Sequence, residues 1–369
     1  MQCKSILVLA VGAACAVAAG AAAAQTRVEL YGSVDAGVSY VNNARGEGMT
    51  MVDSGNRSPD RFGLRGSEDL GGGYKALFGI ESGFNLDTGT QKNPSKLFQR
   101  RAFVGVSGPI GTFSLGHMPD FMYDYLRFQS NGIMGSAYFF HPGNLDNQAN
   151  QFQIDNAIRY ETPTYRGFKA GAMYGAGERP ESSARSRSYS LGAQYVGGPL
   201  KANLAYTVSR DRALNLGATL GLGSVLGQTL SADPSAIDAT YINFNADRVA
   251  SFGATGSYTI GRFTPHAMVS RVKLENRVGA EVQQNFELGS DYALAPNDTL
   301  GVSVATSKFA DVRWDQFNVI NMYRFSKRTT LYAAFAYQRA RNGVAVISSL
   351  APSSTNKQMV SRIGIHHLF

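Results

Sequence analysis

The sequence predicts an all-β protein, a transmembrane antiparallel β-barrel of about sixteen strands. Apolar and polar residues alternate in segments along most of the chain, and turns rich in Gly, Asn, Asp and Ser separate the segments. No stretch after the leader approaches the roughly 18 apolar residues that a membrane helix requires. A chain that crosses a bilayer without such a helix must form a closed barrel, because only closure satisfies every backbone polar group.

The N-terminus carries a leader, in which Lys4 precedes an apolar run that ends in small residues up to Ala24. This pattern predicts a secretory signal peptide, residues 1–24, cleaved between Ala24 and Gln25. No stop-transfer pattern follows the leader. Residues 25–369 repeat one pattern throughout, so we expect a single barrel domain.

Cysteine and charge exclude several classes of site. Cys3 and Cys15 both lie in the leader, so the mature chain can form neither a disulfide nor a cysteine metal site. The formal net charge is +8, but the basic residues do not gather in one run or on one helix face. An exported chain meets little nucleic acid, so we expect no nucleic-acid partner. We also expect no metal and no cofactor.

The first segment after the leader illustrates the alternation. Leu30, Val38 and Tyr40 share one face, whereas Glu29 and Asp35 share the other. An even number of such segments suits antiparallel closure. The predicted strands are 28–42, 60–68, 72–86, 97–107, 111–117, 154–162, 166–175, 187–197, 200–210, 248–260, 262–274, 282–294, 298–308, 312–325, 328–341 and 358–369.

The connections alternate between tight turns and long insertions. Glycine-bearing turns at 69–72 and 108–110 contrast with the long segments 43–59, 118–153, 211–247 and 342–357. Short turns on one rim and long loops on the other are typical of outer-membrane barrels. Aromatic residues near strand ends favour girdles at the two lipid interfaces.

Five stretches resemble the Gram-negative general (non-specific) porin family, in its β-proteobacterial form. They are VELYG at 28–32, RFGLRGSEDLGGG at 61–73, ESGFN at 81–85, FQRRAFVGV at 98–106 and the terminal GIHHLF at 364–369. The resemblance covers essentially the whole mature chain.

The resemblance implies a function and an assembly. It implies a water-filled barrel of sixteen strands in the outer membrane, open to passive diffusion of small hydrophilic solutes and ions, and no enzymatic activity. It further implies a homotrimer among outer-membrane lipid and lipopolysaccharide, with the third long loop, 118–153, folded inward as the constriction. The terminal Phe369 resembles the signal that the barrel assembly machinery reads.

Arginines on the wall are the candidate pore residues. Arg61 matches the second-strand arginine of the family, and Arg61 and Arg65 alternate with apolar neighbours, so both should face the lumen. Arg65 could equally sit at the wet rim. The resemblance selects Arg100 on the fourth strand, whereas strand parity selects Arg101, and a bulge could reconcile the two.

The constriction loop is expected to be lightly charged. Its candidate acids are Asp120, Asp124 and Asp146, and its base is Arg127. Together with the positive net charge, this balance predicts a weak preference for anions or little preference. Three departures from the family pattern each remove a positive charge near the expected constriction: His117, Gln153 and Ser33.

Two other functions remain open at this point. A substrate-specific channel of the same class would use aromatic residues in or near the loop, namely Tyr123, Tyr125, Tyr138, Phe139 and Phe140. An outer-membrane lipid hydrolase would need a serine and a histidine on one face, and its candidate histidines are His266, His366 and His367. His366 and His367 are adjacent, so they point to opposite faces. No Gly-x-Ser-x-Gly or His-x-Glu motif supports a hydrolase.

Overall fold

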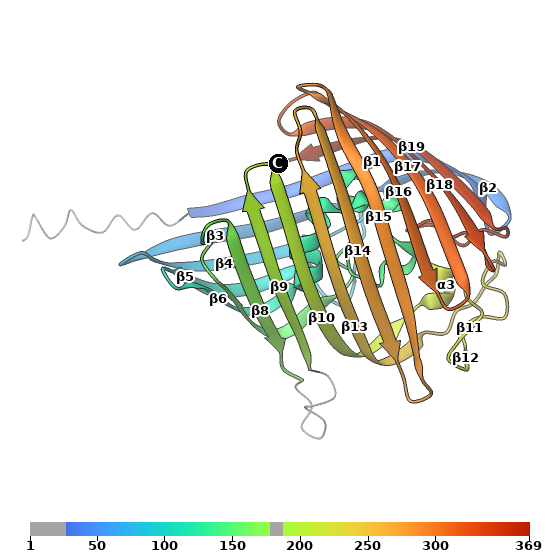
Figure 1. Ribbon diagram of the computed structural model, residues 1–369, viewed down its shortest axis with the longest axis horizontal. Coiled ribbons are helices and arrows are strands. Elements are labelled where there is room, and N and C mark those ends of the chain that lie inside the picture. The colour runs from blue at the N-terminus through green and yellow to red at the C-terminus, as the bar shows by residue number, and fades with distance from the viewer. Residues whose placement is uncertain (1–26, 178–186) are drawn as a thin grey trace, which may run out of the picture.

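A computed structural model describes residues 27–177 and 187–369, so the predicted cleavage site at Ala24 and Gln25 lies outside the described residues. Antiparallel strands form one wall that closes on itself, because the first strand, β1, pairs with the last, β19 (Figure 1). No helix in the described part of the chain is long and apolar enough to cross a membrane.

The barrel wall comprises β1 (Arg27–Ala44), β2 (Glu47–Ser54), β3 (Arg61–Gly71), β4 (Tyr74–Gly83), β5 (Arg101–Gly108), β6 (Gly111–Pro119), β7 (Gln153–Glu161), β8 (Phe168–Gly175), β9 (Ser188–Gly197), β10 (Leu200–Leu214), β13 (Phe244–Tyr258), β14 (Phe263–Glu275), β15 (Ala280–Ala295), β16 (Asp298–Phe309), β17 (Val312–Arg324), β18 (Thr329–Arg341) and β19 (Lys357–Leu368).

The expectation of a long loop at 43–59 is wrong in part, because this segment contains strand β2. The loop-side half of β1 pairs with β2, and the other half pairs with β3. β2 and β3 therefore share one place in the wall, and the barrel has 16 strand positions, as predicted. Between the two strands the chain leaves the wall at 55–60 and turns into the barrel. Alternation alone did not reveal β2, because each of its faces mixes polar and apolar residues: Thr50 and Val52 share one face, and Met51 and Asp53 share the other.

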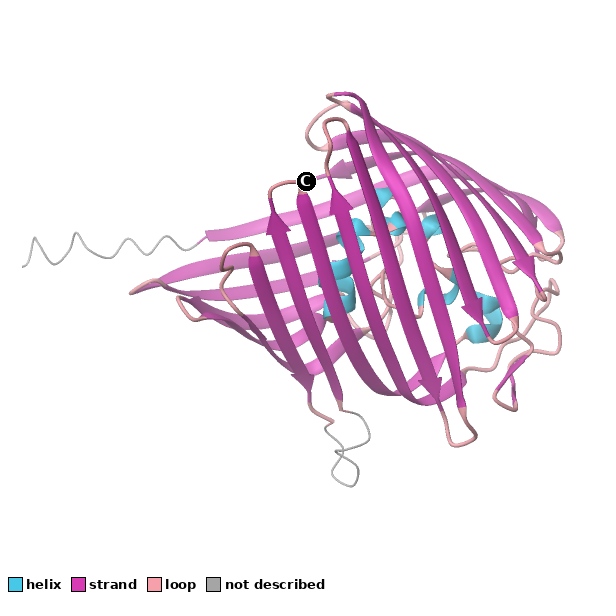
Figure 2. Cartoon of the chain, in the orientation of Figure 1, coloured by secondary structure: helices cyan, strands magenta, loops and turns pink. Residues whose placement is uncertain are grey.

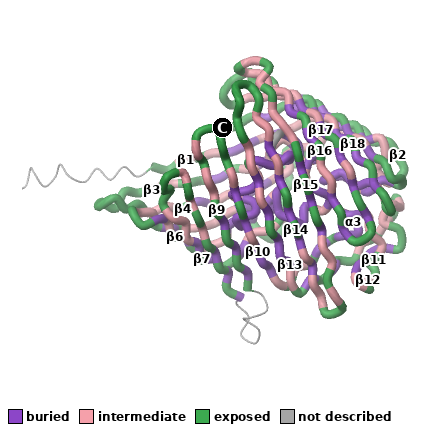
Figure 3. Tube along the Cα trace, in the orientation of Figure 1, coloured by how far each residue is buried: buried purple, intermediate pink, exposed green. Residues whose placement is uncertain are grey.

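The predicted two-faced pattern is confirmed along the strands. On β18, Tyr332, Ala334 and Ala336 are buried, whereas Leu331 and Tyr337 are exposed. Buried and exposed positions alternate along the tube in Figure 3. The exposed apolar residues form the outer surface that faces lipid. Several predicted strand boundaries are displaced. β5 begins at Arg101 rather than at residue 97, β10 ends at Leu214 rather than at 210, and β13 begins at Phe244 rather than at 248.

The long connections lie at one rim, and several of them fold into the barrel. The third loop, 120–152, carries five short helical turns: η1 (Met122–Leu126), η2 (Arg127–Gln129), α2 (Asn131–Gly135), η3 (Ala137–Phe139) and η4 (Pro142–Asn144). These turns lie inside the wall of strands (Figure 2). The segment 215–243 carries α3 (Leu216–Leu220) and a small hairpin of β11 (Ser224–Val225) and β12 (Gln228–Thr229).

Three apolar clusters fill the space between the infolded loops and the wall. One lies around α3, with Leu216, Leu220 and Trp314. A second joins Tyr138 and Phe139 of the third loop to β17, β18 and β19. The third packs Phe121 and Leu126 on the wall. The packed loops thus close much of the interior on the side of β13–β18, and open space remains beside residues 54–60 and 83–85.

Candidate functional site: the constriction

A row of small residues seats the third loop on the wall. Gly171 of β8, Gly192 of β9, Ala205 of β10 and Gly253 of β13 are neighbours in register across four strands. A Cβ atom on Gly171 would lie 2.2 Å from the ring of Phe121, and one on Gly253 would lie 2.5 Å from Leu126. Because larger side chains would clash, this row lets η1 pack directly against the wall.

A buried charged triad holds the middle of the loop. His141 Nδ1 lies 2.8 Å from Asp146 and its Nε2 lies 3.1 Å from Glu287 of β15. Glu287 also accepts the backbone N–H of Asn131 at 2.8 Å, and Ser270 donates to Asp146 at 2.6 Å. Although burial opposes its charge, the two carboxylates raise the pKa of His141 to about 10, and His141 holds the pKa of Asp146 below its ordinary value.

Two of the three predicted loop acids do not line the lumen. Asp146 is buried in the triad just described. Asp120 is buried too, and it accepts the backbone N–H of Tyr123 and the side-chain amide of Asn147, both at 3.0 Å. Burial raises the pKa of Asp120 to about 6. Both acids stabilise the fold of the loop. Their residue type alone does not tell whether an acid is buried in the loop or faces the pore.

The third acid, Asp124, faces arginines of the wall. Arg159 of β7 donates to Asp124 at 2.6 Å, and Arg101 of β5 donates at 3.3 Å. Arg159 also pairs with Glu161 at 3.2 Å and lies over the ring of Phe121 at 4.2 Å. Asp124 is therefore neutralised by the wall. Sequence reasoning did not name Arg159, although it is the one basic residue of its strand.

A cluster of arginines gathers around Glu81 of β4. Arg100 donates through Nε to Glu81 at 2.6 Å, and Arg61 Nε lies 3.6 Å from the other carboxylate oxygen. Arg100 also donates to the Tyr123 hydroxyl at 3.3 Å. The guanidinium of Arg127 lies over the Tyr123 ring, 4.1 Å from its centroid. Two arginines thus pair with one carboxylate and a third lies beside Tyr123, which leaves the cluster with a net positive charge.

Arg100 and Arg101 both point to the inside of the barrel. Arg101 is the strand partner of Glu81, so strand parity places it inward. Arg100 precedes the strand and donates its backbone N–H to the Glu81 carbonyl at 3.3 Å. Two successive residues therefore lie opposite one, which is the arrangement of a bulge. Parity does not apply to Arg100, because it stands before the regular ladder begins.

Arg65 lies further along β3, toward the rim with short turns. It donates to Glu29 at 3.0 and 3.2 Å and lies over the Tyr31 ring at 4.9 Å. Its side chain is 59% exposed. Arg65 is thus inward and wet, but its charge is matched by Glu29, and it stands apart from the cluster at Glu81.

A cavity of about 450 Å³ opens beside the arginine cluster. The charged residues in its lining are Arg57, Asp60, Lys92, Arg100 and Arg127. Asp60 accepts the backbone N–H of Asp35 at 2.6 Å, and burial raises the pKa of its carboxyl. Four cations and one buried acid therefore line the cavity. Sequence reasoning had not assigned Arg57 or Lys92 to the pore, because both lie in connections whose path only the fold defines.

The three departures from the family pattern are engaged in local contacts. His117 contacts Asp155 through Nδ1 and lies 2.8 Å from the Gln99 carbonyl through Nε2. Gln153 donates to the Asn150 carbonyl at 2.7 Å. Ser33 lies 2.9 Å from His366. Gln153 lines the cavity as a neutral amide, whereas His117 and Ser33 do not line it.

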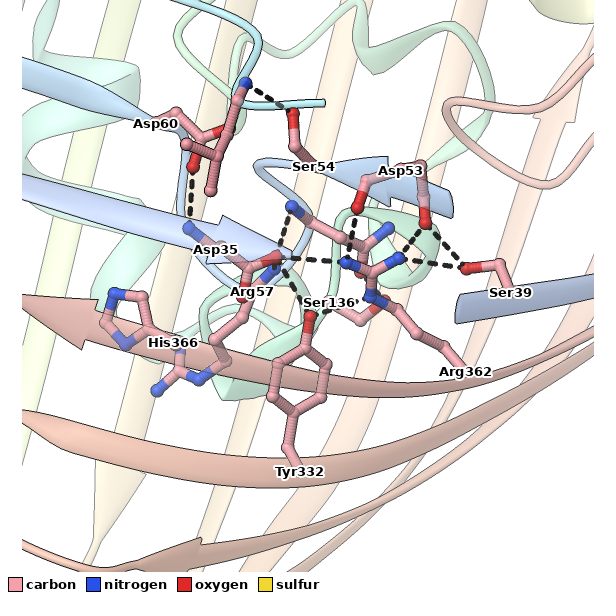
Figure 4. A network of polar contacts seen from close by, with 12 residues as sticks. Asp35, Ser39, Asp53, Ser54, Arg57, Asp60, Ser136, Tyr332, Arg362 and His366 are labelled. Carbon is pink, nitrogen blue, oxygen red and sulfur yellow. Dashed lines mark hydrogen bonds and ion pairs between the residues drawn. The ribbon is translucent and has the colours of Figure 1, made fainter. Parts of the chain in front are cut away.

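A polar network fastens the loops to the place where the barrel closes (Figure 4). Arg362 of β19 donates to Tyr332 at 2.7 Å, to Ser39 at 3.0 Å and to Asp35 at 3.2 Å. It also contacts Asp53 of β2. Tyr138 of the third loop donates to Asp53 at 2.8 Å. The network thus connects the first strand, the last strand and the constriction loop.

The terminal residue completes this closure. Phe369 and Gly32 exchange backbone hydrogen bonds at 3.0 and 3.2 Å. A Cβ atom on Gly32 would lie 2.1 Å from the Phe369 ring, so the ring packs directly over the glycine backbone.

The residues of the two alternative functions have other roles. Tyr125, Tyr138 and Phe139 are buried between loop and wall, whereas Tyr123 and Phe140 reach the cavity. His366 lies inside the barrel and His367 is exposed, as their parity predicts. His367 contacts Thr329 at 2.9 Å. Within the described ranges, no group of three or more His, Cys, Asp or Glu residues could hold a metal ion.

Comparisons with known proteins complete the description of the site. A family model described as Gram-negative porin matches residues 10–343. Outer membrane porin protein 32 of Delftia acidovorans is 29% identical over 386 residues, covering 99% of each chain. An outer membrane porin protein of Bordetella pertussis is 32% identical over 217 residues, covering 51% of this chain and 55% of its own. The solved anion-selective porin from Comamonas acidovorans matches with a TM-score of 0.76 and 24% identity, covering 94% of this chain and 100% of its own.

Proposed function

Because this chain belongs to the Gram-negative porin family and forms an outer-membrane channel, we propose that the arginine cluster at its constriction gives the channel a weak preference for anions. The observation that carries this proposal is the cavity beside Glu81, where Arg57, Lys92, Arg100 and Arg127 face the single acid Asp60. Cations on the wall of a narrow, wet passage lower the energy of an entering anion and raise that of a cation.

The preference is weak because much of the charge is neutralised within the wall. Glu81 offsets part of the charge of Arg61 and Arg100, and Asp124 is shared by Arg101 and Arg159. The named relative from Comamonas acidovorans, an anion-selective porin, supports the sign of the preference. Transport through such a passage is passive and requires no reaction at the site.

The proposal extends to processing, assembly and partners. Residues 25–369 form the mature domain after cleavage between Ala24 and Gln25. Three copies assemble as a homotrimer in contact with outer-membrane lipid and lipopolysaccharide. Phe369 is read by the barrel assembly machinery, and its position where the last strand meets the first supports this role.

Selectivity is tested by removing charge from the cavity. The double variant R100Q/R127Q is compared with wild type through the zero-current potential across a salt gradient in a planar bilayer. One unit charge about 8 Å from an ion contributes about 0.2 kcal/mol when salt at about 0.1 M screens it. Because the charge acts with opposite sign on anions and cations, it changes their permeability ratio by roughly twofold. We expect the anion-to-cation permeability ratio to fall by roughly fourfold in the double variant.

K201Q/R262Q is the control, because both charges are exposed at the rim of short turns and neither lines the cavity. It should change the potential little. An unchanged ratio in R100Q/R127Q would contradict the proposed role of the cluster. A small conductance blocked by one added solute would instead favour a substrate-specific channel that uses Tyr123 and Phe140.

A further inference from the structure

A basic row crosses the outer face of the barrel near the rim with long loops. Arg271, Gln284, Lys308, Arg313 and Arg341 are successive partners in register on β14, β15, β16, β17 and β18, so the row holds four cations and one glutamine. These strands lie side by side in Figure 1. All five side chains are exposed, whereas the neighbours Val272, Phe309, Trp314 and Ala340 are buried inside the barrel. The row therefore faces outward, away from the constriction.

The row lies at the outer boundary of the apolar belt. Arg313 and Tyr323 are about ten residues apart on β17, which is about 33 Å along an extended strand. A tilt of about 40° reduces this length to about 25 Å along the membrane normal, which equals the height of the apolar band of such barrels. With Tyr323 at the rim of short turns, Arg313 stands at the level of the outer-leaflet headgroups.

An apolar groove lies directly below the cations. It has a volume of about 430 Å³, and its lining includes Phe286, Val304, Phe317 and Tyr337. Arg339 and Asp315 stand at its upper end, two positions along the strands from the row. The surface thus changes from basic to apolar over a short length of each strand.

The cations of the row have few carboxylates nearby. Asp315 accepts from Arg313 at 2.9 Å and lies 3.6 Å from Arg341. Among the described residues, no ion pair joins Arg271, Lys308 or Arg339 to a carboxylate. A row with this excess of positive charge favours an anionic partner, and arginine in particular forms bidentate bonds with phosphate.

We propose that this surface binds a phosphorylated, acylated glycolipid of the outer leaflet, the chemistry of the lipid A part of lipopolysaccharide. Its phosphates contact Lys308, Arg313 and Arg341, and one acyl chain lies in the groove along Phe317 and Tyr337. The charge of the row and the apolar groove below it match the two halves of such a lipid. This inference gives a site to the contact with lipopolysaccharide proposed above and rests on that part of the proposed function. The site lies on the opposite face of the wall from the pore, so it is independent of the proposed selectivity.

The test measures binding of bisphosphorylated lipid A to the purified protein in neutral detergent. The variant K308Q/R313Q/R341Q removes three cations of the row. Each cation near a membrane surface contributes about fivefold to the binding of anionic lipid, so we expect the affinity to fall at least tenfold. The control K201Q/R262Q/R328Q removes the same charge at the rim of short turns and should bind as wild type does.

Two further measurements separate the proposal from a nonspecific loss. D315N removes the carboxylate beside the row and should bind bisphosphorylated lipid A more tightly than wild type. Dephosphorylated lipid A should bind wild type no better than it binds the triple variant. Single-channel conductance confirms that each variant is folded. Equal affinity of wild type and the triple variant, or equal binding of the two lipids to wild type, would overturn the proposal.

Discussion

At the scale of single residues, side chains of the same charge have different roles in this channel. Asp120, Asp124 and Asp146 share one loop, yet only Asp124 meets arginines of the wall, while Asp120 and Asp146 are buried as hydrogen-bond acceptors. A buried charge persists only when it is paired and hydrogen-bonded, which Asp146 achieves through His141 and Ser270. The same loop thus divides its acids between holding the fold and facing the pore.

His141 makes the seating of the loop dependent on pH. Its pKa in the folded protein, about 10, is above its ordinary value, so its stabilising effect is full below about pH 6.5 and is lost as the pH rises through 10. Asp146 has a lowered pKa, so its effect is lost only in acid. We expect thermal stability to fall between pH 7 and pH 10 in wild type.

The variant H141Q should lack this part of the pH dependence. Near pH 6 it should be less stable by about 3–5 kcal/mol, because Asp146 and Glu287 lose their buried partner. Thermal unfolding in detergent at pH 6, 8 and 10 gives the comparison, with H367Q, at an exposed histidine of the outer face, as the control. Parallel pH curves for wild type and H141Q would argue against a charged His141.

At the scale of elements, the constriction depends on close contact between a loop and a wall. Phe121 of the loop lies over Gly171 and Gly192, so the wall must present glycine there for η1 to approach. Arg100 shows the effect of irregular backbone. It precedes the regular part of β5, and it points inward beside Arg101, which also points inward. Local irregularity thus adds one cation to the pore.

The variant G171V should narrow the pore. Its side chain would occupy the space of the Phe121 ring and push η1 toward the lumen, at a cost of about 1–3 kcal/mol for overpacking. We expect a smaller single-channel conductance in planar bilayers. The double variant G171V/F121A should restore it.

A matched control is available on β13. At Gly256 the nearest atom to an added Cβ is the Lys201 carbonyl oxygen at 3.8 Å, so G256V should conduct as wild type does. Equal conductance of G171V and G256V would show that contact at Gly171 does not position the loop.

At the scale of the whole molecule, one arginine joins the two ends of the chain. Arg362 connects β19 to Asp35 of β1 and Asp53 of β2, and its side chain is fully buried. Tyr138 brings the constriction loop into the same network. Closure of the barrel and placement of the constriction are therefore physically linked.

The variant R362M should weaken closure, because it leaves Asp35 buried without its cation. Removal of one partner of a buried pair costs about 3–5 kcal/mol. We expect a lower unfolding temperature, measured by the temperature at which the folded barrel loses its fast migration on a gel. R328M, on an exposed turn beside the same strands, should migrate as wild type does. A shared unfolding temperature would mean that the network does not stabilise closure.

Much of the barrel follows directly from the amino-acid sequence. Alternation at period two defines which face meets lipid, because each side chain points opposite to its neighbour on an extended strand. Turn residues separated the strands, and the long third loop was located at 118–153, against 120–152 in the structure. The sixteen wall positions were predicted from residue order. Strand parity also predicted that Arg61 and Arg65 face the lumen, whereas it left Arg100 and Arg101 as alternatives.

The remaining features depend on contacts between residues far apart in the chain. Strand β2 is defined by its partner β1, not by its own pattern. Arg57, Lys92 and Arg100 line one cavity because the loops 55–60 and 84–100 fold toward the same space. Whether an acid of the third loop is buried or faces water depends on the wall opposite it. Strand periodicity is a local property of the backbone, whereas charge pairing and burial are properties of the assembled barrel, so only the tertiary structure decided the chemistry of the pore.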